Sequence, residues 1–464
     1  MNIENDNFTD LRSLSDKLTA LIELPDLINR SNCAESYPLL KPCYLLSKNE
    51  SIPSLTQYSF FMANPTDSLV ISNKKALQSW QARMADNKDT CLNPSNSIPL
   101  HSGWVGIYPY PNTVKDNKDE SVDTVAEFHY YPWVICLTHA SGEFHLLGTP
   151  DNAAKYAFEL LQSKRQRKLQ SKRLNKSDPQ LCNKLTRFKA EKFAPSWRKV
   201  DYAQAFFKIQ DYLKAGDCYQ VNLTQPHKAQ YTGAPLSTLL PLYNALNPSF
   251  GGYFEGKDYT LVSVSPERFI SIDNAGRLEA KPIKGTIKRS LDPKQDQALI
   301  DDLKNSKKNQ AENLMIVDLL RNDLSMSAEP NSVKVEKLFE LETHPNVHHL
   351  VSTISAQLKA GLTAAVAIEN AFPGGSITGA PKKRAMEIID ELEAQPRSLY
   401  CGSFGYYSDS GNVDFNILIR SVEFRNQEMT CWGGGGITID SDCDEEYEES
   451  LTKVRTIMDV IESL

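Results

Sequence analysis

The sequence lacks the features that direct a chain to a membrane or out of the cell. No apolar run approaches the ~18 residues that a membrane-spanning helix needs. Met1 to Asp6 contain neither the basic nor the apolar segment of a secretory signal. The nine cysteines are scattered and include no CxxC pair, which is typical of reduced thiols rather than of disulfides or a zinc site. We therefore expect a cytoplasmic protein that binds no membrane.

The chain also lacks an overall positive charge. Its net charge of −7 over 464 residues argues against general nucleic-acid binding. An anionic ligand would therefore need a local cationic or metal-containing pocket. Residues 164–192 are rich in lysine and arginine, but aromatic side chains are not interleaved with them. A solvated linker is the better interpretation of this stretch than a nucleic-acid site. We place a domain boundary near residue 195, between an N-terminal partner domain (1–195, including the basic linker) and a second domain (196–464).

Local patterns predict elements of both kinds. In the first half, a partly helical segment at 10–28 and strands at 44–46, 58–62 and 133–137 are expected. Asp201 can cap a helix that Gly216 ends, and an alternating strand follows at 219–224. Further on, 292–321 is expected to be mainly helical and 348–352 strand-like. Strands are also expected around 400–406 and 415–422, the second carrying Arg420, which either binds substrate or forms a structural ion pair.

A β-hairpin is predicted around the turn at 273–276, because two alternating segments flank Asx and Gly residues. It would bring Glu267 and Lys284 onto neighbouring strands. Pro282 and Gly285 interrupt regular pairing beside Lys284. A lysine held near an acid and partly desolvated can lose its proton near neutrality and act as a nucleophile. The plainer alternative is a solvated strand lysine with an ion-pair partner.

Two other segments suggest an anion site with a metal nearby. Residues 374–381 are rich in glycine and precede a helix that should begin near Pro381, which favours binding of a small anion. Ala380 and Pro381 occupy the places of the P-loop Lys and Ser/Thr, so we exclude nucleotide binding. The last helix carries Glu446, Glu449 and Lys453 on one face. These glutamates are either an exposed charge ladder or, beside an anionic substrate, ligands of Mg²⁺.

Several long strings, in order, resemble the chorismate-utilising enzymes. The resemblance is dense over residues 200–464 and weak before them. It implies an α+β fold, a sandwich of large, mostly antiparallel sheets with outer helices, as in anthranilate synthase component I. The strings are SPERFI (265–270), PIKGT (282–286), AENLMIVDLLRNDL (311–324), HHLVSTI (348–354), FPGGSITGAPKKRAMEIIDELE (372–393) and the glycines 433–436.

The resemblance assigns roles to individual residues. It implies three catalytic residues, Lys284, Glu267 and His349, and three Mg²⁺ ligands, Glu312, Glu446 and Glu449. Asn309 occupies a place where the family usually has an acid, and Gln220 occupies the place of the lysine base of water-adding relatives. A glutamine cannot deprotonate water, so we do not expect hydroxylated products. The implied substrate contacts are Gly285, Thr286, Ser376, Gly379, Ala380, Tyr400, Arg420, Gly434, Gly435, Gly436 and Lys453.

The resemblance also implies a reaction. We expect Mg²⁺-dependent amination of chorismate by ammonia to 4-amino-4-deoxychorismate, towards 4-aminobenzoate and folate. No glutaminase apparatus is visible in the sequence, so ammonia would come from a separate glutamine amidotransferase subunit. One alternative is anthranilate synthase component I, which carries alanine in place of Lys284. Another is a non-catalytic subunit that binds aromatic acids. A family tryptophan pocket corresponds to Leu55–Tyr58 and Ser249–Gly251, but its usual arginine is missing, which leaves tryptophan binding open.

Overall fold

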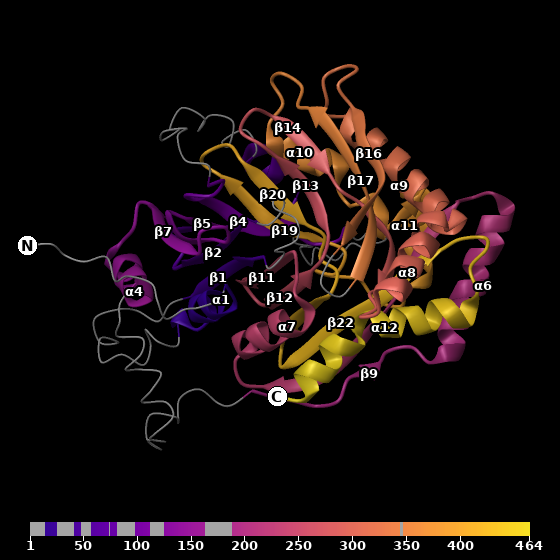
Figure 1. Cartoon of the computed structure of the whole chain (residues 1–464), viewed down its shortest axis with the longest axis horizontal. Helices are drawn as coiled ribbons and strands as arrows, with labels where there is room; N and C mark the ends of the chain where they lie inside the picture. Colours follow the sequence, from indigo (N-terminus) through magenta and orange to yellow (C-terminus); the bar gives the residue numbers. More distant parts are fainter. Residues whose placement is uncertain are drawn as a thin grey trace, which may run out of the picture.

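The computed structural model describes residues 14–25, 41–47, 57–73, 75–80, 98–111, 125–162, 188–343 and 347–464. Its frame is two large sheets in which the neighbouring strands pair antiparallel (Figure 1). Helices cover their outer faces. The expected α+β sandwich of mostly antiparallel sheets is therefore confirmed.

The first sheet joins strands from both halves of the chain. The short strands β8 (Lys189–Ala190) and β9 (Ala194–Pro195) pair with β10 beside the main path. The main path runs in the order β18 (Gly379–Ala380), β10 (Gln220–Thr232), β22 (Glu428–Ile437), β21 (Ser421–Arg425), β12 (Thr260–Ser265), β11 (Phe250–Glu255), β1 (Pro42–Leu46), β2 (Tyr58–Ala63), β6 (Trp133–Thr138) and β7 (Glu143–Gly148).

The second sheet is built in the same mixed way. The hairpin of β13 and β14 confirms the predicted turn at 273–276. Strands β14 and β15 follow one another along the same chain segment and both pair with β17, while β16 (Lys334–Thr343) also pairs with it. The path is β15 (Ile283–Lys288), β17 (Val347–Gln357), β14 (Arg277–Ala280), β13 (Arg268–Ile272), β20 (Val413–Asn416), β19 (Ser403–Ser408), β4 (Gly103–Tyr108), β5 (Ala126–Tyr131) and β3 (Asp67–Ile71).

The helices begin and end largely where the sequence signals predict. Gly216 ends α6 with a left-handed φ of 80°, as expected, but the N-cap is Arg198 and Asp201 is the third helical residue. The reason is that the Asp201 carboxylate accepts from the Arg198 backbone N–H and from the Arg198 guanidinium, so it satisfies the N-cap from the third helical position. The helices are α1 (Leu14–Ile22), α4 (Asn152–Gln162), α6 (Lys199–Ala215), η3 (Pro235–Thr238), α7 (Leu239–Leu246), α8 (Pro293–Asn305), α9 (Lys307–Ser325), α10 (Ala364–Ala371), η4 (Gly375–Ile377), α11 (Lys382–Leu392) and α12 (Cys443–Glu462).

Three of four apolar cores correspond to the layers of the sandwich, and the fourth packs α6 and α11 on β10. One lies between the sheets, where Phe60 and Phe254 of the first sheet meet Ile107 and Phe404 of the second. A second packs α1, α4, α7 and α12 on the outer face of the first sheet, and a third packs α9 and α10 on the second. Residues of α9, α12, β10, β15 and β22 line one cavity.

The two halves of the chain share both sheets. Strand β1 pairs with β11 in the first sheet, and β4 pairs with β19 in the second. The predicted division near residue 195 therefore does not correspond to a break in either sheet. Most of the basic stretch 164–192 lies outside the described residues, as do residues 10–13 and 26–28 of the first expected helix. Among the described helices, none is long and apolar enough to cross a membrane.

Candidate active site

A cavity of about 760 Å³ collects residues from distant parts of the chain. All but two of the predicted site residues line it. Gly379 and Ala380 do not, because they form β18 and pair with Gln220 and Val221 of β10 beside the cavity. The predicted residues that line it are Glu267, Lys284, Gly285, Thr286, Glu312, His349, Ser376, Tyr400, Arg420, Gly434, Gly435, Gly436, Glu446, Glu449 and Lys453.

Lys284 and Glu267 both line this cavity and interact electrostatically. Glu267 stands just before β13 and Lys284 is the second residue of β15, which continues the β13–β14 hairpin along the edge of β17. The Glu267 carboxylate accepts hydrogen bonds from the Ser376 hydroxyl and the Ile283 backbone N–H. The hairpin itself is confirmed, but Glu267 precedes β13 and Lys284 lies on β15, which pairs with β17 and not with β13. The two residues nevertheless line the same cavity.

Burial shifts both groups towards their neutral forms. It raises the pKa of Glu267, an effect that the positive charge of Lys284 and the hydrogen bond from Ser376 partly oppose. It lowers the pKa of Lys284, and Glu267 and Glu312 oppose that shift. A neutral amine is a nucleophile and a protonated carboxyl is an acid, so the pair suits attack coupled to proton donation.

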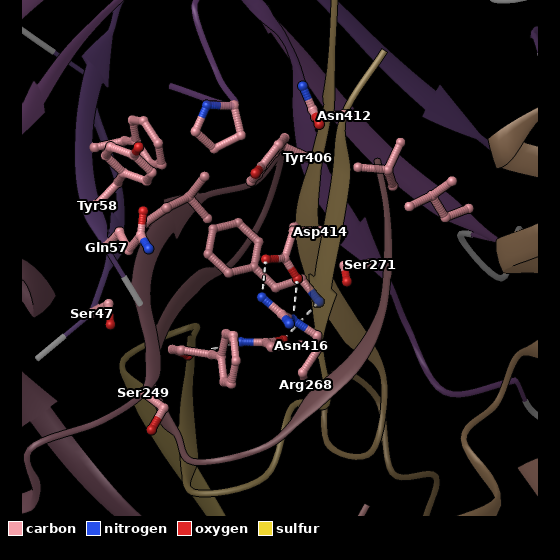
Figure 2. Close-up of a pocket in the computed structure, with 18 of the residues that line it drawn as sticks. Ser47, Gln57, Tyr58, Ser249, Arg268, Ser271, Tyr406, Asn412, Asp414 and Asn416 are labelled. Carbon is pink, nitrogen blue, oxygen red and sulfur yellow. Dashed lines mark hydrogen bonds and ion pairs between the residues drawn. The ribbon is translucent and has the colours of Figure 1, made fainter. Parts of the chain in front are cut away.

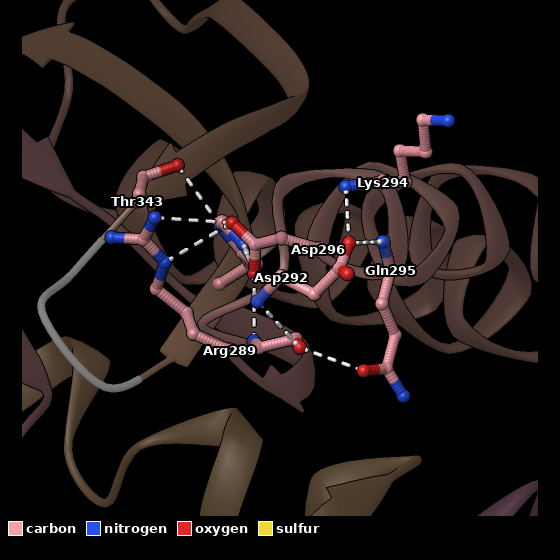
Figure 3. A network of polar contacts seen from close by, with 8 residues as sticks. Arg289, Asp292, Lys294, Gln295, Asp296 and Thr343 are labelled. Carbon is pink, nitrogen blue, oxygen red and sulfur yellow. Dashed lines mark hydrogen bonds and ion pairs between the residues drawn. The ribbon is translucent and has the colours of Figure 1, made fainter.

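His349 is held at the wall of the cavity by its own strand and the next. Its Nδ1 lies 2.7 Å from the Thr286 hydroxyl oxygen, and the two residues are register partners on β17 and β15. Its neighbour His348 is 1% exposed and engages Thr343 and Asp296 instead. Asp296 also accepts from Arg289 and the Ser290 backbone N–H, so one network ties the ends of β15 and β16 to α8 (Figure 3).

Arg420 and Tyr400 lie in connecting segments rather than in the strands that the sequence predicts. Tyr400 stands in a turn before β19, and Arg420 lies between β20 and β21 with φ of 52°. The Tyr400 ring stacks on Trp432, with centroids 5.5 Å apart and planes 6° from parallel. Burial lowers the pKa of Arg420, and no carboxylate of the described chain forms an ion pair with it. The guanidinium is therefore suited to an anionic ligand.

The glycine run of β22 presents backbone to the cavity. Strand β21 pairs with β22 only up to Cys431, so 433–436 have β10 along one edge and line the cavity. A Cβ on Gly433 would lie 2.3 Å from the Ser450 carbonyl oxygen. The close packing of α12 thus explains why residue 433 is glycine. The other edge of 433–436 is open because β21 ends before it reaches them.

The three predicted metal ligands line the same cavity from two helices, Glu312 from α9 and the other two from α12. Glu446 Oε2 and Glu449 Oε1 lie 3.2 and 3.7 Å from where a Cβ on Gly435 would stand, so both face the same space. Lys453 Nζ is 2.7 Å from Glu449 Oε1. No three acidic, His or Cys side chains of the described chain are close enough to form a complete metal site. The carboxylates fit Mg²⁺ in chemistry, while Lys453 engages one of them here.

Sequence reasoning assigned no role to several residues that line the cavity, among them Asn222 and Trp432. Asn222 is two residues from Gln220 on β10, and its side-chain amide donates to the Ile377 carbonyl. Trp432 directly precedes the glycine run, and only its stacking on Tyr400 indicates a role. Gln220 is 1% exposed, and neither its Nε2 nor its Oε1 has a hydrogen-bond partner in the described chain.

A second cavity of about 390 Å³ lies where the sequence places the tryptophan string (Figure 2). Gln57, Tyr58, Ser249 and Phe250 line it, and Leu55 and Thr56 fall outside the described residues. Arg268 and Arg277 both line this cavity, and Arg268 forms a bidentate pair with Asp414 at 2.9 Å. Tryptophan binding stays open. Ser249 lines both cavities.

Comparison with known proteins agrees with this geometry. The chain is 39% identical to aminodeoxychorismate synthase component 1 of Escherichia coli, over 82% of this chain and 81% of that protein. It is 48% identical to the protein of that name from Klebsiella aerogenes, over 58% and 60%. Its fold matches a crystal structure of anthranilate synthase component I from Streptococcus pneumoniae with a TM-score of 0.70 and 24% identity, covering 99% of this chain and 100% of that one. The family model of the chorismate binding enzymes matches residues 41–459. The chain therefore belongs to the chorismate binding enzyme family.

Proposed function

We propose that this protein aminates chorismate with ammonia to 4-amino-4-deoxychorismate, the precursor of 4-aminobenzoate in folate biosynthesis. The observation that carries the proposal is the presence of Lys284 in the cavity beside Glu267. Anthranilate synthase component I, the enzyme alternative, resembles this chain but has alanine at that place. A non-catalytic binding subunit would have no use for a desolvated lysine facing an acid.

Substrate binding follows from charge. Chorismate carries two carboxylates, and Arg420, Lys453 and the backbone edge at 433–436 provide cationic and N–H groups around the cavity. The stacked rings of Tyr400 and Trp432 offer a flat wall to the ring of the substrate. Together these contacts would fix the ring so that C2 lies near Lys284 and the C4 hydroxyl near Glu267.

The chemistry requires two allylic displacements. In the first, the neutral Lys284 amine attacks C2, the two conjugated ring double bonds shift from C1=C2 and C5=C6 to C1=C6 and C4=C5, and the C4–O bond breaks while Glu267 donates its proton, so that water leaves. In the second, ammonia attacks C4, both double bonds return to their original places, and the bond from C2 to Lys284 breaks. The Glu267 carboxylate then takes a proton from the new C4 ammonium. The balance is one ammonia added and one water released.

Mg²⁺ is part of the proposal, with Glu312, Glu446 and Glu449 as its ligands. Its chemistry would be to neutralise a substrate carboxylate and assist departure of the C4 hydroxyl. Glu449 would have to exchange its ion pair with Lys453 for the metal. Lys453 would then be released to bind the substrate.

We further propose that ammonia comes from a glutamine amidotransferase subunit with which this chain forms a heterodimer in the cytoplasm. The component 1 designation of the relatives supports a second subunit. The cysteines that the structure describes form no disulfides, which fits a reducing compartment. They are Cys43, Cys136, Cys218, Cys401, Cys431 and Cys443.

The test is product identification by mass and ultraviolet spectrum. Purified protein is given chorismate, Mg²⁺ and ¹⁵N-ammonium at pH 8.5, where neutral ammonia is more abundant than at pH 7. We expect one ¹⁵N at C4 of the product, and no product when glutamine replaces ammonium. Anthranilate as the main product would contradict the proposed function, and turnover of glutamine by this chain alone would contradict the two-subunit arrangement.

A further inference from the structure

Arg397, five residues after α11, holds a buried ion pair beside the candidate active site. It is 1% exposed and Glu393 is 3% exposed. Its Nε and Nη2 lie 2.8 and 2.7 Å from the two carboxylate oxygens of Glu393. For so buried a pair, the loss of hydration largely offsets the attraction, so stability alone is a weak reason for it.

The rest of the guanidinium binds backbone that lines the active-site cavity. Nη1 donates to the Ile377 carbonyl at 2.9 Å, and Nη2 donates to the Asn222 carbonyl at 2.6 Å. The Asn222 side chain donates to the same Ile377 carbonyl at 2.9 Å. One side chain thus joins η4, which carries Ser376, to the cavity end of β10.

Further contacts extend this arrangement to other segments. The Glu393 carboxylate accepts from the backbone N–H and the hydroxyl of Thr224, at 3.0 and 2.7 Å. The Tyr400 backbone N–H donates to the Arg397 carbonyl at 3.0 Å. The Tyr110 ring, from the first half of the chain, lies 4.8 Å from the guanidinium carbon. Arg397 therefore contacts the supports of Ser376, Asn222 and Tyr400.

We propose that Arg397 is a positioning residue, which holds Ile377 and thereby places the Ser376 hydroxyl on the Glu267 carboxylate. It touches neither substrate nor reacting atoms. The inference rests on the proposed function, since Glu267 is there the proton donor. Loss of the Ser376 hydrogen bond would raise the pKa of Glu267, because that bond favours the carboxylate form.

The test compares Arg397→Lys with Ser376→Ala and with the double variant. Lysine keeps the charge but cannot make the four-bond fork. We expect Arg397→Lys to lower kcat about 10- to 100-fold with a much smaller change in KM for chorismate. The alkaline limb of the kcat profile, where Glu267 loses its proton, should move to higher pH in both single variants. The double variant should show no further shift. Arg384→Lys is the matched control, since Arg384 is on α11 and pairs with Glu387 and Asp217 outside the cavity.

A purely structural role would lower the melting temperature and kcat of Arg397→Lys, leave the alkaline limb in place, and make the two substitutions additive. That outcome would overturn the inference. Should Arg397→Lys fail to fold, Thr224→Val provides a milder test, because it removes only the hydroxyl that donates to Glu393. The alkaline limb should again move to higher pH in Thr224→Val, and Thr224→Ser, which keeps the hydroxyl, should retain the wild-type profile.

A measurement that does not depend on turnover, amide hydrogen exchange, separates this inference from the proposed function. In Arg397→Lys, amide hydrogen exchange should rise about 10-fold or more over residues 374–380 and 398–402 and stay unchanged in α8. Unchanged exchange there would contradict the positioning role even in an active enzyme. A wild-type protein that forms no 4-amino product would contradict the proposed function, while the exchange result would still decide the role of Arg397.

Discussion

At the scale of single residues, the site depends on charges that compensate one another in a partly buried space. Glu267, Glu312 and Glu449 all act on Lys284, and Lys453 lies among them. Glu446 and Glu449 crowd the same space near Gly435, where a dianionic substrate would be repelled without a cation. This arrangement supports the proposal that an anionic substrate binds here together with a divalent cation.

Glu312→Gln or Glu449→Gln should lower turnover about 100-fold or more, because each removes a charge that the proposed Mg²⁺ site needs. The melting temperature should change little. Glu448→Gln, on the exposed side of α12, is the control and should keep wild-type activity. Steady-state rates over a range of Mg²⁺ concentrations test this, and near-normal activity of either variant at low Mg²⁺ would refute the metal assignment.

How far single residues could be predicted depended on whether their partners are near in sequence. The turn at 273–276 predicts the hairpin, and the hairpin brings Glu267 to Lys284, so that pair was accessible from the sequence. Trp432 was not, because its role depends on stacking against Tyr400, which arrives from another part of the chain. No local pattern encodes such a contact.

At the scale of elements, strand β17 lines the cavity with one side chain and contacts helix α8 with the next. His349 faces the cavity, and His348 faces Asp296 on α8. Hydrogen bonds from Ser290 and Arg289 and the contact with His348 lower the pKa of Asp296 to about 2. Because this value is below the ordinary 3.8, the stabilisation is present above pH 3.8 and is lost as the pH falls towards 2.

Asp296→Asn should therefore lower the melting temperature by a few degrees at pH 7. The difference from wild type should shrink as the pH falls below 4, where the wild-type carboxylate is itself being protonated. Melting curves between pH 7 and 3 measure this. Asp302→Asn, on the same helix but exposed, should follow wild type at every pH. A difference that stays constant with pH would refute the network as the cause.

Gly433→Ala should separate α12 from β22. The added Cβ would meet the Ser450 carbonyl oxygen at 2.3 Å, so the helix must shift and take Glu446 and Glu449 with it. We expect a loss of about 1–3 kcal/mol in the free energy of unfolding together with reduced turnover.

Gly361→Ala is the control for that substitution, because nothing lies within 4 Å of its Cβ and only its φ of 83° is strained. It should lose stability without losing turnover. Denaturant unfolding and steady-state kinetics compare the two variants. Full activity of Gly433→Ala would contradict the tight packing of helix on strand.

Element boundaries were predictable where caps and turns are local. Gly216 ends α6 and Pro381 precedes α11 as the sequence indicates. Tyr400 and Arg420 were expected in strands and instead lie in connections. The left-handed φ of 52° at Arg420 interrupts the apolar run there, and side-chain pattern alone does not reveal such a backbone turn.

At the scale of the whole molecule, the proposed catalytic residues lie in the second half of the chain, whereas both sheets contain strands from both halves. The pairs β1–β11 and β4–β19 close each sheet across the predicted boundary near 195. Pairing between strands so distant in sequence leaves no local signal in the sequence. The family strings, by contrast, are dense only after residue 200, and they suggested a boundary there. This is why the boundary was predicted where the sheets continue.

A fragment of residues 196–464 should therefore not fold alone. It would expose the edges of β11 and β19 and the inter-sheet core that includes Phe254 and Phe404. We expect no cooperative thermal transition by circular dichroism, and soluble, active protein when residues 1–195 are co-expressed. A cooperatively melting, active fragment would show that the first half is dispensable.

The most direct test of the whole account is the position of nitrogen in the product of Lys284→Ala. Wild type with chorismate, Mg²⁺ and ¹⁵N-ammonium should place ¹⁵N at C4 only, and without ammonia it should carry chorismate less one water on Lys284, detectable by peptide mass. In Lys284→Ala, C2 is open to ammonia, so ¹⁵N spectroscopy should find the 2-amino isomer or anthranilate. A Lys284→Ala enzyme that makes only the 4-amino product at an undiminished rate, with no adduct on wild type, would contradict the account.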